Sequence, residues 1–221
     1  MSQIFTLTQT SSEADIDEAV SAAIQAVTYG GLAVIPTDTS YAVIADAFNP
    51  DAMRQLRDAK GQSPEVSVPI GAGNLATIEG VATLTTLARD LVNAFWPGAL
   101  TVLTKAQPSV LLQVGSSDSS LATRIPNNEV ARAVLGGIGP TAMTGAQKAG
   151  EQSVTKIRQA QAALGDAVTV YIDSGELPGD ESTVIDATSE HLRLIRPGVL
   201  GLEQLRAVVP MIIDSSTTGN L

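Results

Sequence analysis

Four basic residues stand where this chain could bind an anion. Lys60, Arg124, Lys148 and Arg196 lie at the ends of predicted elements or in a glycine-rich loop. Lys60 and Lys148 are also within two residues of a glycine, where backbone amides can turn toward a phosphate or carboxylate. Taken singly, each of the four is more simply explained as a surface charge.

Short polar side chains follow a strand that the sequence predicts to be buried. Leu32 to Ile35 is a continuous apolar run, typical of a strand covered on both faces, and Pro36 ends its hydrogen bonding. Thr37, Asp38 and Thr39 come directly after it, at the edge where ligands of open α/β sheets bind. The alternative is an ordinary turn whose side chains satisfy their own backbone.

A second pair of hydroxyls, Ser182 and Thr183, begins another predicted strand. A pocket combining Thr37, Thr39 and Ser182 with converging cations would suit an amino acid and a nucleoside triphosphate, although spacing alone does not predict that combination. The usual signatures are absent, because the chain has neither a P-loop nor a G-x-S-x-G elbow. The one histidine, His191, lies in a predicted hairpin turn, where a solvated side chain is expected.

The composition limits the class of protein. The 221 residues are 44% hydrophobic and fit one large domain or two small ones. The net charge of −10 and the 3% aromatic content disfavour a nucleic-acid surface, so direct RNA binding is not expected. With no cysteine and one histidine, thiolate and histidine-rich metal sites are excluded, and no metal ligand is assigned. No membrane span or signal sequence is evident, so we expect a cytoplasmic protein.

Hydrophobic periodicity and capping residues predict a mixed α/β fold. We expect helices at residues 13–29, 50–60, within 76–95, and at 127–135, 153–164 and 202–209. Strands are expected at 32–35, 41–45, 67–71, 100–104, 121–126, 168–172, 182–186 and 192–196, with a loop at 139–150. The short connection between the last two strands makes them antiparallel. We expect one domain at 1–209 and a short, frayed C-terminal tail at 210–221.

Seven blocks of the sequence together resemble the YrdC-like family, the threonylcarbamoyl-AMP synthases. They follow the family's order and spacing over roughly residues 12 to 209. The blocks are Gly30-Gly31 with Pro36-Thr37-Asp38-Thr39-Ser40-Tyr41, Lys60-Gly61, Phe95-Trp96-Pro97-Gly98-Ala99-Leu100-Thr101, Arg124-Ile125-Pro126, Gly139-Pro140-Thr141-Ala142 with Thr144-Gly145-Ala146-Gln147-Lys148-Ala149-Gly150, Ser182-Thr183-Val184-Ile185-Asp186 and Leu194-Ile195-Arg196-Pro197-Gly198.

The resemblance implies a single domain with a twisted mixed sheet, flanking helices and a concave ligand-binding face. It implies an ATP-dependent nucleotidyltransferase that makes threonylcarbamoyl-AMP and pyrophosphate from L-threonine, bicarbonate and ATP, with Mg²⁺ accompanying the ATP. The product would pass to a downstream transferase for threonylcarbamoyladenosine modification of tRNA.

Carried over residue by residue, the resemblance assigns the site. Lys60 and Arg124 would be catalytic, and Arg124 would pair with a substrate carboxylate or phosphate. The substrate-binding residues would be Thr37, Thr39, Gln147 and Ser182. The nucleotide-binding residues would be Lys60, Lys148, Thr183 and Arg196. No protein nucleophile is needed, because the site would orient the carbamate against the α-phosphorus.

The chain departs from the family pattern at several positions. Gln62 stands where the family usually has an arginine, so one cation is lost. Gly145, Gln147 and Ala149 replace two hydroxyls and an asparagine. Each lost charge-assisted contact is worth on the order of 1.5–3 kcal/mol. The alternative hypothesis is therefore a paralogue that binds a nucleotide, or a protein or RNA partner, without turnover.

Overall fold

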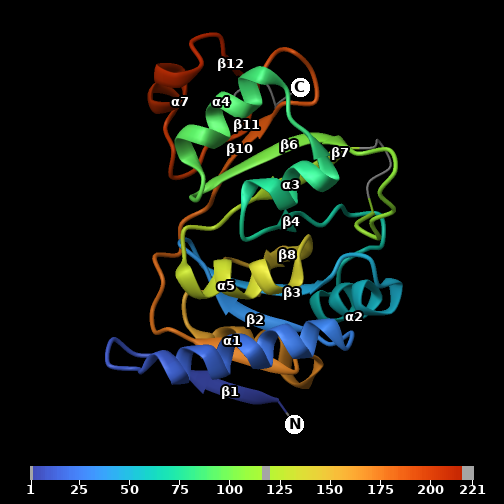
Figure 1. Ribbon diagram of the computed structural model, residues 1–221, viewed down its shortest axis with the longest axis vertical. Helices are drawn as coiled ribbons and strands as arrows, with labels where there is room; N and C mark the ends of the chain where they lie inside the picture. Colours follow the sequence, from blue (N-terminus) through green and yellow to red (C-terminus); the bar gives the residue numbers. More distant parts are fainter. Residues whose placement is uncertain (1, 116–119, 216–221) are drawn as a thin grey trace.

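The computed structural model describes residues 2–115 and 120–215, which form a single α/β domain on one mixed sheet (Figure 1). The strand order is β1-β9-β2-β3-β8-β4-β7-β6-β10-β11-β12, with β5 pairing to the side of β6. The strands are β1 Gln3–Thr6, β2 Ala33–Pro36, β3 Tyr41–Asp46, β4 Ile70–Gly71, β5 Ala82–Thr83, β6 Leu100–Ala106, β7 Ser120–Arg124, β8 Thr141–Gly145, β9 Val170–Asp173, β10 Thr183–Asp186, β11 Arg193–Arg196 and β12 Ile213–Asp214. Parallel and antiparallel pairs both occur, as the sequence predicts.

Helices pack against the sheet along its length. They are α1 Glu13–Thr28, α2 Pro50–Lys60, α3 Leu75–Val81, α4 Thr86–Phe95, α5 Glu129–Ile138, α6 Ile157–Leu164 and α7 Leu202–Val208, with a 3₁₀ turn at Gly165–Ala167. In Figure 1, α1 and α5 lie together at one end of the molecule, and α4 and α7 lie at the other. Within residues 2–115 and 120–215, no helix has the length and apolar character needed to cross a bilayer.

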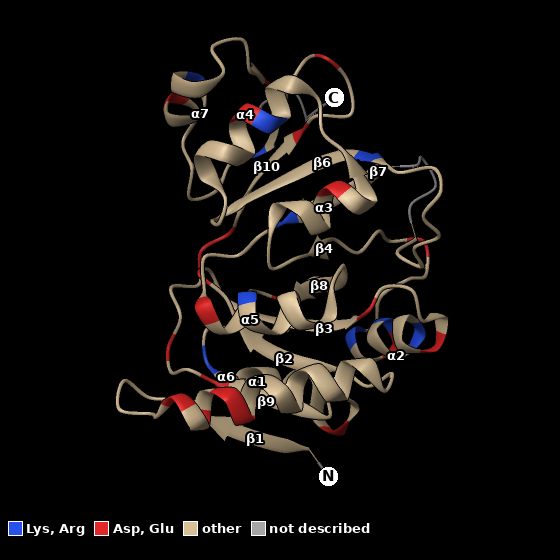
Figure 2. Ribbon diagram, in the orientation of Figure 1, with Lys and Arg blue, Asp and Glu red and all other residues tan. Residues whose placement is uncertain are grey.

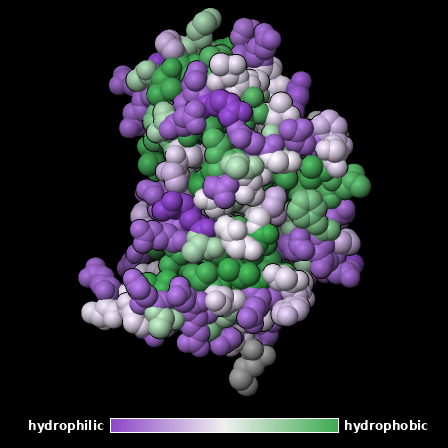
Figure 3. All heavy atoms as spheres, in the orientation of Figure 1, coloured by the Kyte–Doolittle hydropathy of each residue, from purple (hydrophilic) through white to green (hydrophobic). Residues whose placement is uncertain are grey.

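The central strands are buried on both faces, as the apolar run at 32–35 predicts. Along β2, Val34 packs in a cluster with α2 and α6, while its neighbours Ala33 and Ile35 pack against α1 and α5. A band of hydrophobic residues marks the region where α1 and α5 meet (Figure 3). A third cluster joins α4 and α7 to β6, β10 and β11. The sheet is therefore packed against helices at both of its ends.

Local capping signals fix α2 and thereby Lys60. The Asn49 side chain accepts from the backbone amides of residues 51 and 52, and Pro50 occupies the first turn. Gly61 ends the helix in the left-handed conformation, with φ of 65°, which glycine adopts without steric strain. Lys60 is therefore held at the last turn, next to the loop that follows β8.

The prediction of a loop throughout 139–150 is wrong. Residues Thr141–Gly145 form β8, an antiparallel strand that lies between β3 and β4 in the sheet. Flanking glycines and a proline indicate a loop locally, but the partners on both sides come from distant parts of the chain. Pairing with those partners satisfies the backbone groups of β8 and outweighs the local signals.

Several element boundaries also differ from the sequence prediction. The strand Gln3–Thr6 is not predicted, because its pairing with β9 is a long-range contact. The strand expected at 67–71 is limited to Ile70–Gly71, and α6 begins at Ile157 rather than at residues 153–156. In the tail, Ile213–Asp214 pairs with β11, so the expectation of fraying from residue 210 is wrong for this pair. Residues 216–221 lie outside the described range.

Candidate functional site

A polar cavity of about 380 Å³ lies where the β2–β3 turn and β8 face β6, β7, β10 and β11. It brings together residues from widely separated parts of the chain. Six of the sequence-predicted site residues line it: Thr37, Thr39, Arg124, Gln147, Ser182 and Arg196. A shallower depression of about 580 Å³ near Phe48 and Leu111 has no titratable side chain in its lining. The smaller cavity is therefore the candidate site.

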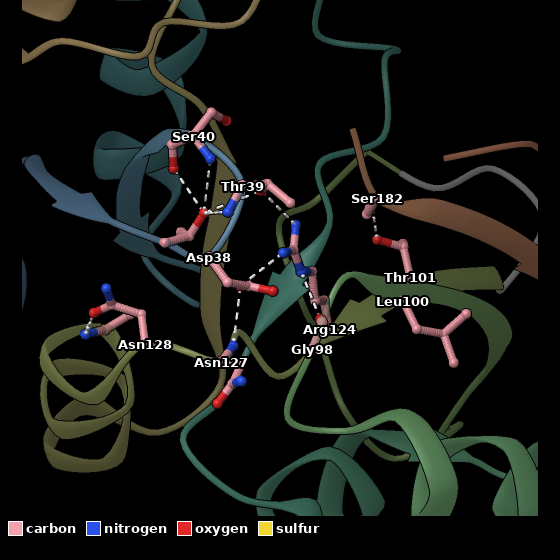
Figure 4. Close-up of polar contacts among 12 residues, drawn as sticks. Asp38, Thr39, Ser40, Gly98, Leu100, Thr101, Arg124, Asn127, Asn128 and Ser182 are labelled. Atoms are coloured by element: carbon pink, nitrogen blue, oxygen red, sulfur yellow. Dashed lines mark hydrogen bonds and ion pairs between the residues drawn. The ribbon is translucent and has the colours of Figure 1, made fainter. Parts of the chain in front are cut away.

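The turn after β2 presents two buried threonines to the cavity. The hydroxyls of Thr37 and Thr39 are 3.1 Å apart, and Thr37 Oγ1 donates to the carbonyl of Ser40 at 2.6 Å. The backbone amides of Thr39 and Ser40 in turn donate to Thr37 Oγ1 (Figure 4). The Thr37 hydroxyl therefore hydrogen-bonds the backbone of its own turn, as expected for an ordinary turn. Thr37 also lines the cavity.

Arg124, at the end of β7, is buried and bound at three points. Its Nη2 donates to Asp38 Oδ1 at 2.8 Å, its Nη1 to Thr39 Oγ1 at 3.1 Å, and its Nε to the carbonyl of Gly98 at 3.1 Å (Figure 4). Asp38 Oδ1 also accepts from the amide of Asn127 at 3.0 Å. Burial lowers the pKa of Arg124, and the Asp38 carboxylate opposes that shift. The guanidinium is therefore oriented before any ligand binds.

Arg196 and two hydroxyls form the opposite wall. Arg196 Nη2 donates to the carbonyl of Ser182 at 2.9 Å and to its hydroxyl at 3.2 Å. The Ser182 and Thr101 hydroxyls are 2.8 Å apart (Figure 4). Arg196 also forms an ion pair with Glu181 at 3.4 Å, and both side chains are about half exposed. Thr101 was not assigned from the sequence, because the alternating pattern of the strand predicted at 100–104 explains a threonine there without a functional role.

The two lysines and Thr183 lie behind the cavity rather than in its lining. Lys60 Nζ donates to the carbonyl of Gly145, and to that of Gln147 at 2.7 Å. Lys148 Nζ donates to the carbonyl of Ala59 at 2.6 Å, which ties the loop back to α2. Burial, with a smaller effect of Lys148, lowers the pKa of Lys60 to about 8. The Thr183 hydroxyl donates to the carbonyl of Leu200 at 2.9 Å.

Acidic side chains balance the arginines of the cavity. Asp180 and Glu181 line it on the connection between β9 and β10, and Asp38 holds Arg124. This connection carries several of the acidic residues coloured red in Figure 2. Sequence reasoning missed Asp180 and Glu181, because a turn-rich link gives no sign that it crosses a site. In the part of the chain that the structure describes, no group of three or more histidine or acidic residues is arranged to hold a metal ion.

This arrangement defines an α/β protein with a preformed polar cavity that contains two arginines and several hydroxyl groups. Its volume is in the range of small-molecule pockets, which is about 300–1,000 Å³. Two arginines supply charge, and the hydroxyls of Thr37, Thr39, Thr101 and Ser182 supply hydrogen bonds in a restricted space.

Comparison with known proteins identifies the family. A family model for Sua5/YciO/YrdC proteins, described as "telomere recombination", matches residues 25–198. A protein of Mycobacterium tuberculosis H37Rv, provisionally named a threonylcarbamoyl-AMP synthase, is 36% identical over 86% of this chain and 88% of its own length. The threonylcarbamoyl-AMP synthase of Bacillus subtilis is 30% identical, and the match covers 81% of this chain and 53% of the relative.

A solved structure agrees with that assignment. The crystal structure of Pyrococcus abyssi Sua5 complexed with L-threonine superposes with a TM-score of 0.86 at 28% identity, covering 98% of this chain and 64% of that chain. The chain belongs to the Sua5/YciO/YrdC family. The fold class and family that the sequence blocks predict are therefore confirmed.

Proposed function

We propose that the protein is an L-threonylcarbamoyladenylate synthase. It would combine L-threonine, bicarbonate and ATP into threonylcarbamoyl-AMP, pyrophosphate and water. The family membership supports the reaction class, and the cavity supports the substrate class. The observation that carries the proposal is the convergence of Thr37, Thr39, Arg124, Ser182 and Arg196 on one hollow.

The amino-acid end of the site would lie between the β2–β3 turn and Ser182. The hydroxyls of Thr37, Thr39 and Ser182 can accept from the ammonium of L-threonine and can donate to or accept from its hydroxyl. Arg124 would bind the carboxylate, because a guanidinium already held by Asp38 and Thr39 loses little freedom when it binds. Gln147 would contribute a carboxamide on the wall next to β8.

The nucleotide end would be at Arg196, with Lys60, Lys148 and Thr183 supporting it. Arg196 is half exposed and can leave Glu181 for a phosphate, since an exposed ion pair contributes only about 0–1 kcal/mol. Lys60 and Lys148 would add positive potential behind the wall and hold the loop at 145–149 in place. Mg²⁺ would come with the ATP phosphates as part of the substrate.

The chemistry would depend on orientation and charge rather than on a protein nucleophile. The amine of L-threonine would first attack the carbon of bicarbonate, and water would leave to give the threonine carbamate. An oxygen of this carbamate would then attack the α-phosphorus, and the bond to the bridging oxygen would break, so that pyrophosphate leaves with the electron pair. Arg196 would stabilise the negative charge that develops on the phosphate oxygens, while Arg124 holds the carboxylate of L-threonine. The product would then serve a downstream tRNA-modifying transferase.

Pyrophosphate release tests this proposal. The protein should release pyrophosphate from ATP only when both L-threonine and bicarbonate are present, and Arg124→Ala should reduce the rate by at least about tenfold. An unchanged rate without threonine or bicarbonate would contradict the proposal.

A second candidate is a relative that binds nucleotide without turnover. It is favoured by the loss of a cation at Gln62 and by the engagement of Lys60 with backbone carbonyls. ATP binding without pyrophosphate release would identify that case. Direct RNA binding remains disfavoured by the net charge of −10.

A further inference from the structure

Gly145 and Gln147 are packed against each other on one wall of the cavity. Gly145 is the last residue of β8, and both residues line the cavity. A Cβ atom at position 145 would meet the whole carboxamide of Gln147, at 2.8 Å from Nε2 and 2.9 Å from Cδ. The Gln147 carboxamide therefore occupies the space where any other residue 145 would place its side chain.

The backbone does not require glycine at this position. Gly145 is not among the glycines with positive φ, and it pairs in register with Ala42 of β3. Gly61 differs, because its φ of 65° favours glycine whatever surrounds it. What Gly145 provides is room for the carboxamide.

The backbone around Gln147 is held from three sides, so a new side chain could not be accommodated by moving it. Lys60 donates to the carbonyls of Gly145 and Gln147. The amide of Ala146 donates to the carbonyl of Tyr41 at 3.0 Å, and that of Ala149 to the carbonyl of Lys60 at 2.9 Å. A methyl group at 145 would therefore displace the carboxamide, which is the end of a flexible side chain.

The carboxamide has hydrogen-bonding capacity to spare. Gln147 Oε1 is buried and has no hydrogen-bond partner among residues 2–115 and 120–215. A buried acceptor that lacks a partner is unfavourable by about 1–3 kcal/mol, so the packing of the carboxamide against β8 has a cost. Oε1 lies on the β8 side, and it is Gln147 as a residue that lines the cavity and can meet a ligand.

We propose that Gly145 is a positioning residue for Gln147. By lacking a side chain, it lets the Gln147 carboxamide rest against β8, where the carboxamide lines the cavity and forms a hydrogen bond with a polar group of the bound substrate. The identity of that substrate rests on the proposed function, and the polar group belongs either to L-threonine or to the nucleoside of ATP.

The first test does not depend on any ligand. The side-chain amide signals of Gln147 in a ¹H–¹⁵N NMR spectrum are identified by their loss in Gln147→Ala. We expect Gly145→Ala to shift them while the protein stays folded. The control Gly136→Ala, in α5, adds a methyl group that meets nothing within 4 Å and should leave them in place. Unchanged signals in Gly145→Ala would overturn the proposal.

The second test is a double-mutant cycle measured by calorimetry with L-threonine and with ATP. Gly145→Ala and Gln147→Ala should each weaken binding of the same ligand by about threefold to tenfold. Since Gly145 acts through Gln147, the double variant should bind no more weakly than Gln147→Ala alone. If the fold-changes in affinity of the two single variants multiply in the double variant, the two residues act independently and the proposal is overturned. If the unmodified protein binds neither ligand, the proposed function fails, and the NMR shift alone decides the positioning role.

Discussion

The ion pair between Asp38 and Arg124 gives a quantitative test of how the site is built. The two side chains are 16% and 10% exposed, and Asp38 Oδ1 accepts from both Arg124 Nη2 and the amide of Asn127. Asp38→Asn keeps the shape and an acceptor but removes the charge. A bond to a charged group contributes about 1.5–3 kcal/mol and a neutral bond about 0.5–1.5 kcal/mol. The substitution weakens two hydrogen bonds and leaves the buried Arg124 guanidinium without its counter-charge. Together these effects predict that the free energy of unfolding falls by about 3 kcal/mol.

Urea unfolding followed by the fluorescence of Trp96, the one tryptophan, measures this change. The matched control is Asp51→Asn, which breaks the Asp51–Arg54 pair, where the side chains are 76% and 68% exposed. Because that pair is solvated, we expect the control to lower the free energy of unfolding by less than about 1 kcal/mol. Equal effects of the two substitutions would refute the account of a preformed, buried Arg124.

Three further predictions follow from other contacts. Lys60 has a pKa of about 8 in the fold and 10.5 as its ordinary value. The unfolded chain therefore binds more protons between these pH values, and the free energy of unfolding should rise by about 3 kcal/mol from pH 8 to pH 10.5 relative to Lys60→Met, measured by urea unfolding. Thr101→Val removes the hydroxyl 2.8 Å from Ser182, and should raise the KM for L-threonine by about threefold to tenfold with kcat little changed, in a pyrophosphate-release assay. Gly61→Ala places a methyl group in open space at φ of 65°, so backbone strain alone should destabilise the protein by about 1 kcal/mol, measured by thermal unfolding with Gly136→Ala as the control.

The fold was predictable where the local pattern and the tertiary contacts agree. The apolar run at 32–35 is buried on both faces, and the helix start at Asn49-Pro50 is the start of α2. β1 and β8 could not be predicted, because their pairing partners are distant in sequence and their own residues read as a terminus and a loop. Both strands form because of pairing with distant residues, and the local sequence of each segment does not reveal that pairing.

The site was only partly predictable for a related reason. The resemblance to the family assigns Arg124, Arg196, Thr37, Thr39 and Ser182 to the site, and the fold brings them to one cavity. The sequence does not say that Lys60 would face the carbonyls of Gly145 and Gln147, since that depends on how α2 packs beside β8. Nor does it show that Glu181 and Asp180 would balance the arginines.

A crystal structure of the protein soaked with ATP and L-threonine tests the central claim most directly. The account predicts L-threonine in the cavity, with its carboxylate on Arg124 and its polar groups within hydrogen-bond distance of Thr37 or Ser182, and ATP with its phosphates at Arg196. Ligands bound outside the cavity, or a cavity that stays empty while both ligands bind in solution, would contradict it.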